Sequence, residues 1–171
     1  APKHPYLLNL LVQVYRQIND WQALANLLPT VKKYANYSKS SLDALQLEVY
    51  QRLIANGHLT KVSLKQLWQE IPAQLRHRGG LILGYTQQLI RLGCLTEAEI
   101  QLRLALKSAW QPELVYQYGL IITENPLPQL QTAQGWLKQH GGSTLLYLTL
   151  ARLASANQLW GQATHYLQEC L

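Results

Sequence analysis

Gly93-Cys94-Leu95-Thr96-Glu97-Ala98 places a short turn and then an alanine between two segments whose apolar residues have helical spacing. The stretch Asn157-Gln158-Leu159-Trp160-Gly161-Gln162-Ala163 does the same further along the chain. Ala98 and Ala163 are 65 residues apart, close to two periods of about 33 residues. That period is typical of arrays in which each repeat is a pair of helices. Such arrays usually act as binding surfaces.

The composition agrees with a helical array or one compact domain. Hydrophobic residues make up 48% of the 171 residues and charged residues 14%, so the chain can fold without the charge density of a disordered protein. No apolar run approaches the roughly 18–20 residues of a membrane helix. The sequence has neither a starting Met nor a signal-peptide pattern, so we expect a fragment of a longer protein.

The net charge of +6 is concentrated in the first half of the chain. Residues 1–91 carry eleven Lys and Arg against four Asp and Glu, whereas the remainder carries four against five. A basic half suits an anionic partner or membrane surface, and it suits an ordinary solvated face equally well. Residues 61–78 are basic without the interleaved aromatics of a base-stacking surface, so we predict no nucleic-acid partner.

Apolar residues recur at spacings of three and four along most of the chain, which predicts ten helices in five antiparallel pairs. Each helix is short, so stacking on its neighbours has to supply burial. Local signals set the expected boundaries: a kink or restart at Pro29, a cap at Ser63, a break at Gly79-Gly80, a capping box from Thr96 to Glu99, and a helix from Pro112 to about Thr123.

Three predicted units match the tetratricopeptide pattern well and a fourth matches plausibly, while the second unit fits worst. In this pattern small residues let paired helices approach, and large ones fill the space between repeats. The residues that match are Ile82, Tyr85, Thr86, Leu89, Ala98, Leu102 and Ala105 in the third unit; Val115, Tyr118, Gly119, Ile122, Ala133 and Leu137 in the fourth; Tyr147, Leu150, Ala151, Ala154, Ala163, Leu167 and Cys170 in the fifth; and Leu8, Leu11, Val12, Tyr15, Leu24, Leu28 and Val31 in the first. We therefore predict an all-α, right-handed tetratricopeptide-like solenoid. It forms a single domain, 1–171, with units at about 4–36, 41–78, 79–110, 112–140 and 143–171.

Four tryptophan-bearing segments are more particular: Asp20-Trp21-Gln22-Ala23-Leu24, Leu67-Trp68-Gln69-Glu70-Ile71-Pro72, Gly135-Trp136-Leu137 and Leu159-Trp160-Gly161-Gln162-Ala163. Their order resembles the carboxy-terminal repeat region of the HemY family, bacterial tetratricopeptide proteins associated with haem biosynthesis. The resemblance implies a parent protein of the bacterial inner membrane, with amino-terminal membrane helices and no established catalytic role. It brings no motif of functional residues with it.

An association with haem directs attention to ligands for its iron. The candidates are the tyrosines together with His4, His58, His77, His140, His165, Cys94 and Cys170. No Cys-x-x-Cys-His attachment motif is present, and the two cysteines have the spacing of packing residues. We assign no cofactor and no metal, with haem as the one candidate.

Catalytic motifs are missing from the sequence. It contains no glycine-rich phosphate loop, no His-Glu-x-x-His and no Gly-x-Ser-x-Gly. Glu97 and Glu99 are two residues apart on a predicted helix and so face different directions. We predict that the chain is not an enzyme.

A partner-binding groove is the expected functional site. In tetratricopeptide arrays the first helix of each pair lines one face, and amide and guanidinium groups on it can grip a peptide backbone or a carboxylate. The residues that fall there are Asn9, Gln13, Arg16, Gln17, Gln87, Arg91, Tyr116 and Arg152. We expect Arg16, Arg91 and Arg152 to share one groove, although an ordinary solvated helix face would carry the same residues.

The function predicted from these observations is a non-catalytic scaffold that binds proteins or peptides, including haem-pathway enzymes. The alternative is a direct haem or porphyrin carrier. The last predicted helix ends at Cys170 and Leu171 without a polar capping helix, so we also expect end-to-end self-association.

Overall fold

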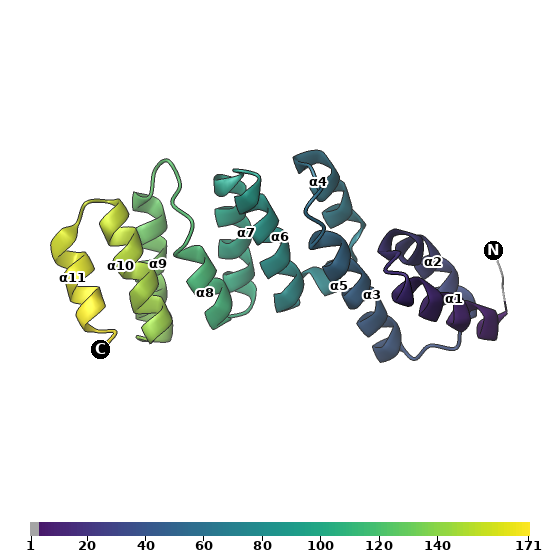
Figure 1. Cartoon of the computed structure of the whole chain (residues 1–171). Helices are drawn as coiled ribbons and strands as arrows, with labels where there is room; N and C mark the ends of the chain where they lie inside the picture. Colours follow the sequence, from purple (N-terminus) through teal and green to yellow (C-terminus); the bar gives the residue numbers. More distant parts are fainter. Residues whose placement is uncertain (1–3) are drawn as a thin grey trace. The chain divides into compact units, whose positions relative to one another are not determined.

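The computed structural model describes residues 4–171, and this range contains helices and no strands (Figure 1). The all-α fold predicted from the sequence is confirmed, while the right-handed sense of the solenoid stays a prediction. Within the described residues eleven helices are formed instead of ten: α1 Pro5–Gln17, α2 Trp21–Tyr34, α3 Lys39–Ile54, α4 Lys61–Glu70, α5 Ala73–Arg76, α6 Gly79–Arg91, α7 Leu95–Ser108, α8 Pro112–Tyr118, α9 Leu127–His140, α10 Thr144–Ala156 and α11 Trp160–Gln168.

The helices belong to two compact units, one ending at Gly84 and the other running from Tyr85 to Leu171. In the first unit α2 packs against both α1 and α3. In the second unit α8 packs against α7 and α10, and α10 also packs against α9 and α11. The proposed division of residues 1–171 into one domain of five repeat units stays a prediction.

The turn predicted at Gly93 and near Gln158 occurs three times within residues 4–171. Asn19, Gly93 and Gln158 each have a positive φ, of 57°, 73° and 59°, and each stands two residues before a helix. In every case the next backbone N–H donates to a carbonyl five residues back: Asp20 to Tyr15 (2.9 Å), Cys94 to Leu89 (2.8 Å) and Leu159 to Ala154 (2.9 Å). This left-handed cap ends one helix and redirects the chain into the next. The alanines that follow the later two turns, Ala98 and Ala163, are buried.

One boundary prediction in the first unit was wrong, and another is tested only in part. Pro29 lies inside α2, which continues to Tyr34 without restarting, while the alternative of a kink at Pro29 stays a prediction. The N-cap of α4 is Thr60, and Ser63 is the third helical residue, completing a capping box with it.

The extra helix, α5, begins directly after Pro72. Proline disfavours helical geometry in the residue before it, so α4 ends before Ile71 and a new helix starts beyond the proline. Arg76 of α5 reaches back and donates Nε to the Ile71 carbonyl and Nη2 to the Gln69 carbonyl, each at 2.8 Å. Its guanidinium thereby satisfies carbonyls that the early end of α4 leaves without intrahelical partners.

Two further boundaries near α6 and α7 were also predicted incorrectly. Gly79-Gly80 lies within the first turn of α6 and does not separate two helices. The N-cap of α7 is Cys94, which has no side-chain cap bond, so Thr96 and Glu99 do not form a capping box. The Glu99 carboxylate instead contacts the next helix, as described below.

Helix α8 ends at Tyr118, about five residues before the predicted end at Thr123. Its final carbonyls find side-chain partners: Thr149 Oγ1 of α10 donates to the Val115 carbonyl at 2.9 Å. Gly119 makes this approach sterically feasible, because a Cβ at that position would lie 2.7 Å from Thr149 Oγ1. The short helix is therefore held against α10 by a backbone contact that only glycine allows.

Candidate partner-binding site

Two of the residues predicted to bind a partner, Tyr116 of α8 and Arg152 of α10, lie together in the second unit. The Arg152 guanidinium carbon is 4.9 Å from the centre of the Tyr116 ring, within cation–π range. Tyr116 is 37% exposed, and Arg152 is half-buried. The pair is therefore held at the surface of two helices that pack directly on each other.

Arg152 is unusual because its charge has no acidic partner among residues 4–171. Its Nη1 atom is buried and has no hydrogen-bond acceptor among the described residues. A buried guanidinium N–H without an acceptor costs free energy, which the contact with the Tyr116 ring offsets only in part. Because Arg152 as a residue is only half-buried, a carboxylate of another molecule could pair with its charge, whereas the buried Nη1 would be reached only after the side chain shifts.

In the first unit, Asn9, Gln13 and Arg16 of α1 line a shallow depression of about 500 Å³. The start of α3 and the loop before it form the opposite wall, through Asn36, Tyr37, Ser38 and Ser41. Arg16 also forms an ion pair with Glu48 of α3. This depression is polar, and the Arg16 guanidinium in its lining is already paired with the Glu48 carboxylate.

The remaining predicted residues are exposed and lie apart from these two places. Gln17 ends α1 outside the depression, and Gln87 is exposed on α6. Arg91, also on α6, donates Nε to Gln88 Oε1 at 2.7 Å. Arg16 belongs to the first unit, and Arg91 and Arg152 to the second, so a groove shared by all three stays a prediction.

Sequence reasoning missed a pocket of about 670 Å³ between α7 and α9, which we call the aromatic pocket. Its residues are Arg103, Leu104, Leu106, Lys107, Ser108, Trp110, Thr132, Gly135, Trp136, Gln139 and His140. The Trp110 ring stacks on His140 with centroids 3.9 Å apart and meets Trp136 edge-on at 5.7 Å. The i, i+4 pairs Arg103–Lys107 and Trp136–His140 are the sequence signal that could have revealed it.

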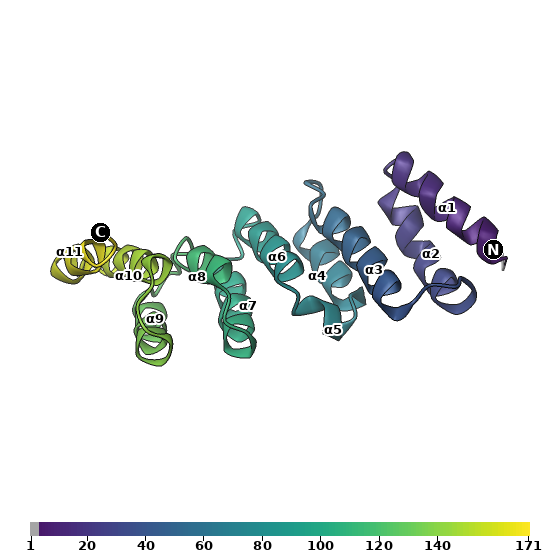
Figure 2. The same ribbon diagram turned by 90° about the horizontal axis from the view of Figure 1, so that it is seen from below.

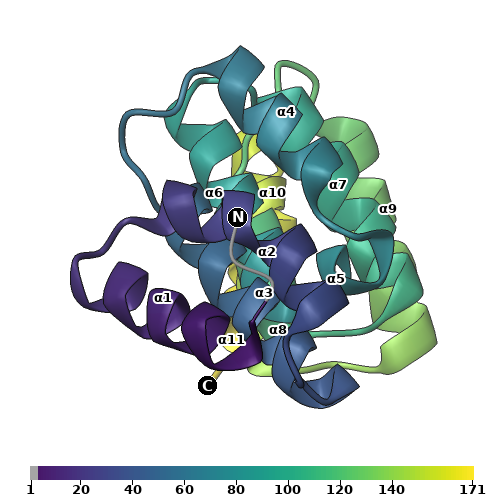
Figure 3. The same ribbon diagram turned by 90° about the vertical axis from the view of Figure 1, so that its right-hand side faces the viewer.

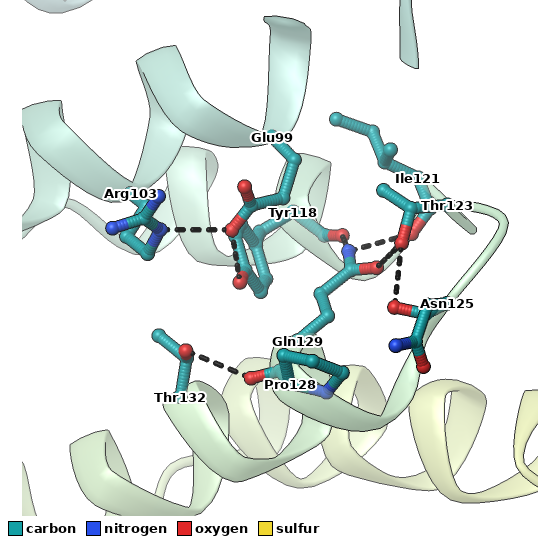
Figure 4. A network of polar contacts seen from close by, with 9 residues as sticks. All are labelled: Glu99, Arg103, Tyr118, Ile121, Thr123, Asn125, Pro128, Gln129 and Thr132. Atoms are coloured by element: carbon teal, nitrogen blue, oxygen red, sulfur yellow. Dashed lines mark hydrogen bonds and ion pairs between the residues drawn. The ribbon is translucent and has the colours of Figure 1, made fainter. Parts of the chain in front are cut away.

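Next to the aromatic pocket, a polar network joins α7, α8 and α9 (Figure 4). Glu99 Oε1 accepts from the Tyr118 hydroxyl at 2.7 Å and from Arg103 Nε at 3.0 Å. Burial raises the pKa of Tyr118 well above its ordinary value, and the hydrogen bond to Glu99 raises it further. The neutral hydroxyl thus remains a donor to the carboxylate, so the network fixes the helices in place.

Gln129 completes this network from α9. Its buried Nε2 donates to the carbonyl of Tyr118, the last residue of α8 (3.1 Å), and to that of Ile121 just beyond it (2.7 Å) (Figure 4). The Tyr118 carbonyl also accepts from the Ile121 N–H at 3.3 Å, so the amide supplements this turn and supplies the Ile121 carbonyl with a side-chain donor.

The residues considered as haem ligands are dispersed. His140 lies in the aromatic pocket, while the His165 ring is 5.8 Å from that of Tyr166 on α11. The thiols of Cys94 and Cys170 contact backbone carbonyls. Within residues 4–171, no three His, Cys, Asp or Glu side chains are grouped closely enough to hold a metal ion.

Two further observations concern the helix surfaces. Among the described residues, no helix is both long and apolar enough to cross a bilayer. Apolar side chains are exposed on and after α11, at Trp160, Leu167 and Leu171. The predicted end-to-end self-association through this region stays a prediction.

Comparison with known proteins gives one consistent similarity. The chain is 22% identical over 166 residues to Protein HemY of Escherichia coli K12, and it has the same identity to Protein HemY of Shigella flexneri. These matches cover 96% of this chain and 42% of each relative, so the chain spans less than half of their length. No family model and no solved structure matches it. The similarity supports a HemY-like relationship, and the assignment to a carboxy-terminal repeat region stays a prediction.

Proposed function

We propose that this chain is a non-catalytic binding module that docks protein or peptide partners on the face formed by α8 and α10. The observation that carries the proposal is the half-buried guanidinium of Arg152, which lies against Tyr116 and has no acidic partner within residues 4–171. Arginine suits this role because its planar group can stack on an aromatic ring and still bind a carboxylate with two parallel hydrogen bonds.

The similarity to HemY proteins over nearly the whole chain extends the proposal to a cellular setting. By that resemblance, the parent protein resides at the bacterial inner membrane. Its partners include enzymes of haem biosynthesis, which this module would hold close to one another. The chain itself would contribute binding surfaces, with the chemistry performed by its partners.

Selection of peptides from a random display library on the immobilised protein tests this proposal. Selected peptides should carry a carboxylate, and Arg152→Gln should weaken their binding at least about tenfold, because the substitution removes a charge-assisted hydrogen bond. Arg52→Gln is the matched control, since Arg52 also lies over an aromatic ring, that of Trp21 at 5.4 Å, but outside the predicted groove. Equal loss in both variants, or none in Arg152→Gln, would refute the role of Arg152.

A direct haem or porphyrin carrier is the second candidate, and the position of His140 favours it. The imidazole lies in the aromatic pocket near Arg103 and Lys107, whose charges could pair with propionate groups. Haem titration of the protein tests this: a carrier should shift the Soret band, and His140→Ala should abolish the shift. His58→Ala, which changes an exposed histidine elsewhere, should leave it intact.

A further inference from the structure

The aromatic pocket is a second surface, separate from the face that carries Arg152. Figures 2 and 3 place α7 and α9 on the same side of α8 and α10. The pocket opens between α7 and α9, and its lining includes the buried Leu106 and Trp136 and Leu104, which is 52% exposed. Its volume of about 670 Å³ exceeds what one side chain needs and lies within the range of ligand sites.

The charged residues that line the pocket have one sign. Arg103 and Lys107 line it, and no Asp or Glu of the described residues does. Arg103 is bonded to Glu99 through Nε alone, whereas Lys107 has no ion-pair partner within residues 4–171. The two cations stand one turn apart on α7, roughly 6 Å along the helix axis.

Gly135 keeps the pocket open on the α9 side. It lies inside α9, where glycine costs about 1 kcal/mol relative to alanine. A Cβ built on Gly135 would meet nothing within 4 Å, so packing within the described residues does not require a glycine there. Gly119 is the opposite case, since a Cβ there would collide with Thr149. The absence of a side chain at Gly135 thus leaves space at the pocket and costs helix stability.

We propose that the aromatic pocket binds an acidic peptide segment of a partner protein, inserting one aromatic or large aliphatic side chain. That side chain would fill the space over Gly135 and contact Trp136, while carboxylates on either side pair with Arg103 and Lys107. Arg103 and Lys107 have long side chains and stand one helical turn apart, so carboxylates on both sides of the inserted residue can reach them. A row of carboxylates therefore fits this edge, and the proposal does not depend on Arg152.

The test uses a fluorescein-labelled peptide, Glu-Glu-Trp-Glu-Glu, with its C-terminus amidated, and measures its fluorescence anisotropy with the whole chain. Gly135→Leu should fill the pocket and weaken binding at least tenfold without lowering the melting temperature. Gly161→Leu is the matched control, because Gly161 is also helical and also has open space around its Cβ position. Lys107→Gln should weaken binding several-fold and reduce its dependence on salt.

Several results would overturn the proposal. One is peptide binding that survives Gly135→Leu; another is no binding at protein concentrations up to about 1 mM. Equal binding of Lys-Lys-Trp-Lys-Lys would remove the charge argument. Loss of binding in Arg152→Gln but not in Gly135→Leu would assign the acidic peptide to the α8–α10 face. A haem-dependent Soret shift that Gly135→Leu abolishes, without peptide binding, would assign the pocket to a tetrapyrrole.

Discussion

The hydroxyl of Tyr118 donates a 2.7 Å hydrogen bond to the carboxylate of Glu99, and this contact joins α8 to α7 at the centre of the second unit. Tyr118 is fully buried, and its ring also meets that of Trp136 on α9 edge-on at 4.6 Å. One side chain thus connects three helices. The stability of the second unit should depend strongly on it.

Tyr118→Phe should lower the free energy of unfolding by about 1.5–3 kcal/mol, the range for a hydrogen bond to a charged group. The ring contacts persist, but the half-buried Glu99 loses a donor. Tyr147→Phe is the control, because the Tyr147 hydroxyl has no hydrogen-bond partner among the described residues. Urea titration of both variants measures the difference, and equal stabilities would contradict the role assigned to this contact.

Alkaline pH should destabilise the protein through the same tyrosine. Burial raises the pKa of Tyr118 in the folded state, whereas the unfolded chain ionises near the ordinary value of 10.0. Above that pH the unfolded state loses a proton that the folded state keeps, so the free energy of unfolding falls as pH rises. The expected contribution is about 1.4 kcal/mol per pH unit for each such tyrosine.

Burial and the charge of Glu70 also raise the pKa of Tyr50, so the unsubstituted chain carries at least two tyrosines with a raised pKa. Between about pH 10 and 12, the free energy of unfolding should therefore fall less steeply with pH for Tyr118→Phe than for the unsubstituted chain. An unchanged slope would show that Tyr118 ionises normally in the folded state.

Gln129→Leu should be among the most destabilising single changes in the second unit, at about 2–4 kcal/mol. It removes the side-chain donor of the Ile121 carbonyl and leaves the Tyr118 carbonyl with only the Ile121 N–H, at 3.3 Å. Gln131→Leu, at an exposed position of the same helix, should change stability by less than about 0.5 kcal/mol. Thermal unfolding of the pair would reveal the contrast, and similar melting temperatures would argue against it.

Gln158→Gly should stabilise the chain by about 1 kcal/mol, because residue 158 adopts a left-handed conformation that favours glycine. Gly93→Ala should do the opposite by a similar amount at the equivalent turn. Chemical denaturation of both variants checks the expected opposite signs. A destabilised Gln158→Gly would mean that the three turns do not share one geometry.

The sequence predicted what depends on local spacing and missed what depends on distant side chains. The turns at Gly93 and Gln158 and the buried alanines after them follow from short-range pattern. The early end of α8 does not, since it depends on Thr149 and Gln129, which supply donors from other helices.

The binding surfaces divide in the same way. Tyr116 and Arg152 were chosen for their places on the first helices of two pairs, and the structure brings their side chains together. The aromatic pocket was missed because its residues come from two helices and a connection, and because Gly135 contributes space and no side chain.

Photo-crosslinking inside living bacteria, with a benzophenone amino acid replacing Tyr116, tests most directly whether a partner docks on the face formed by α8 and α10. The control position is Ile100 on α7, which is equally exposed at 37% and lines neither the α8–α10 face nor the aromatic pocket. A discrete protein adduct at position 116, absent at position 100 and lost with Arg152→Gln, is the predicted result. Adducts of equal yield at both positions would contradict docking on the α8–α10 face. So would an adduct at position 116 whose yield is unchanged in Arg152→Gln.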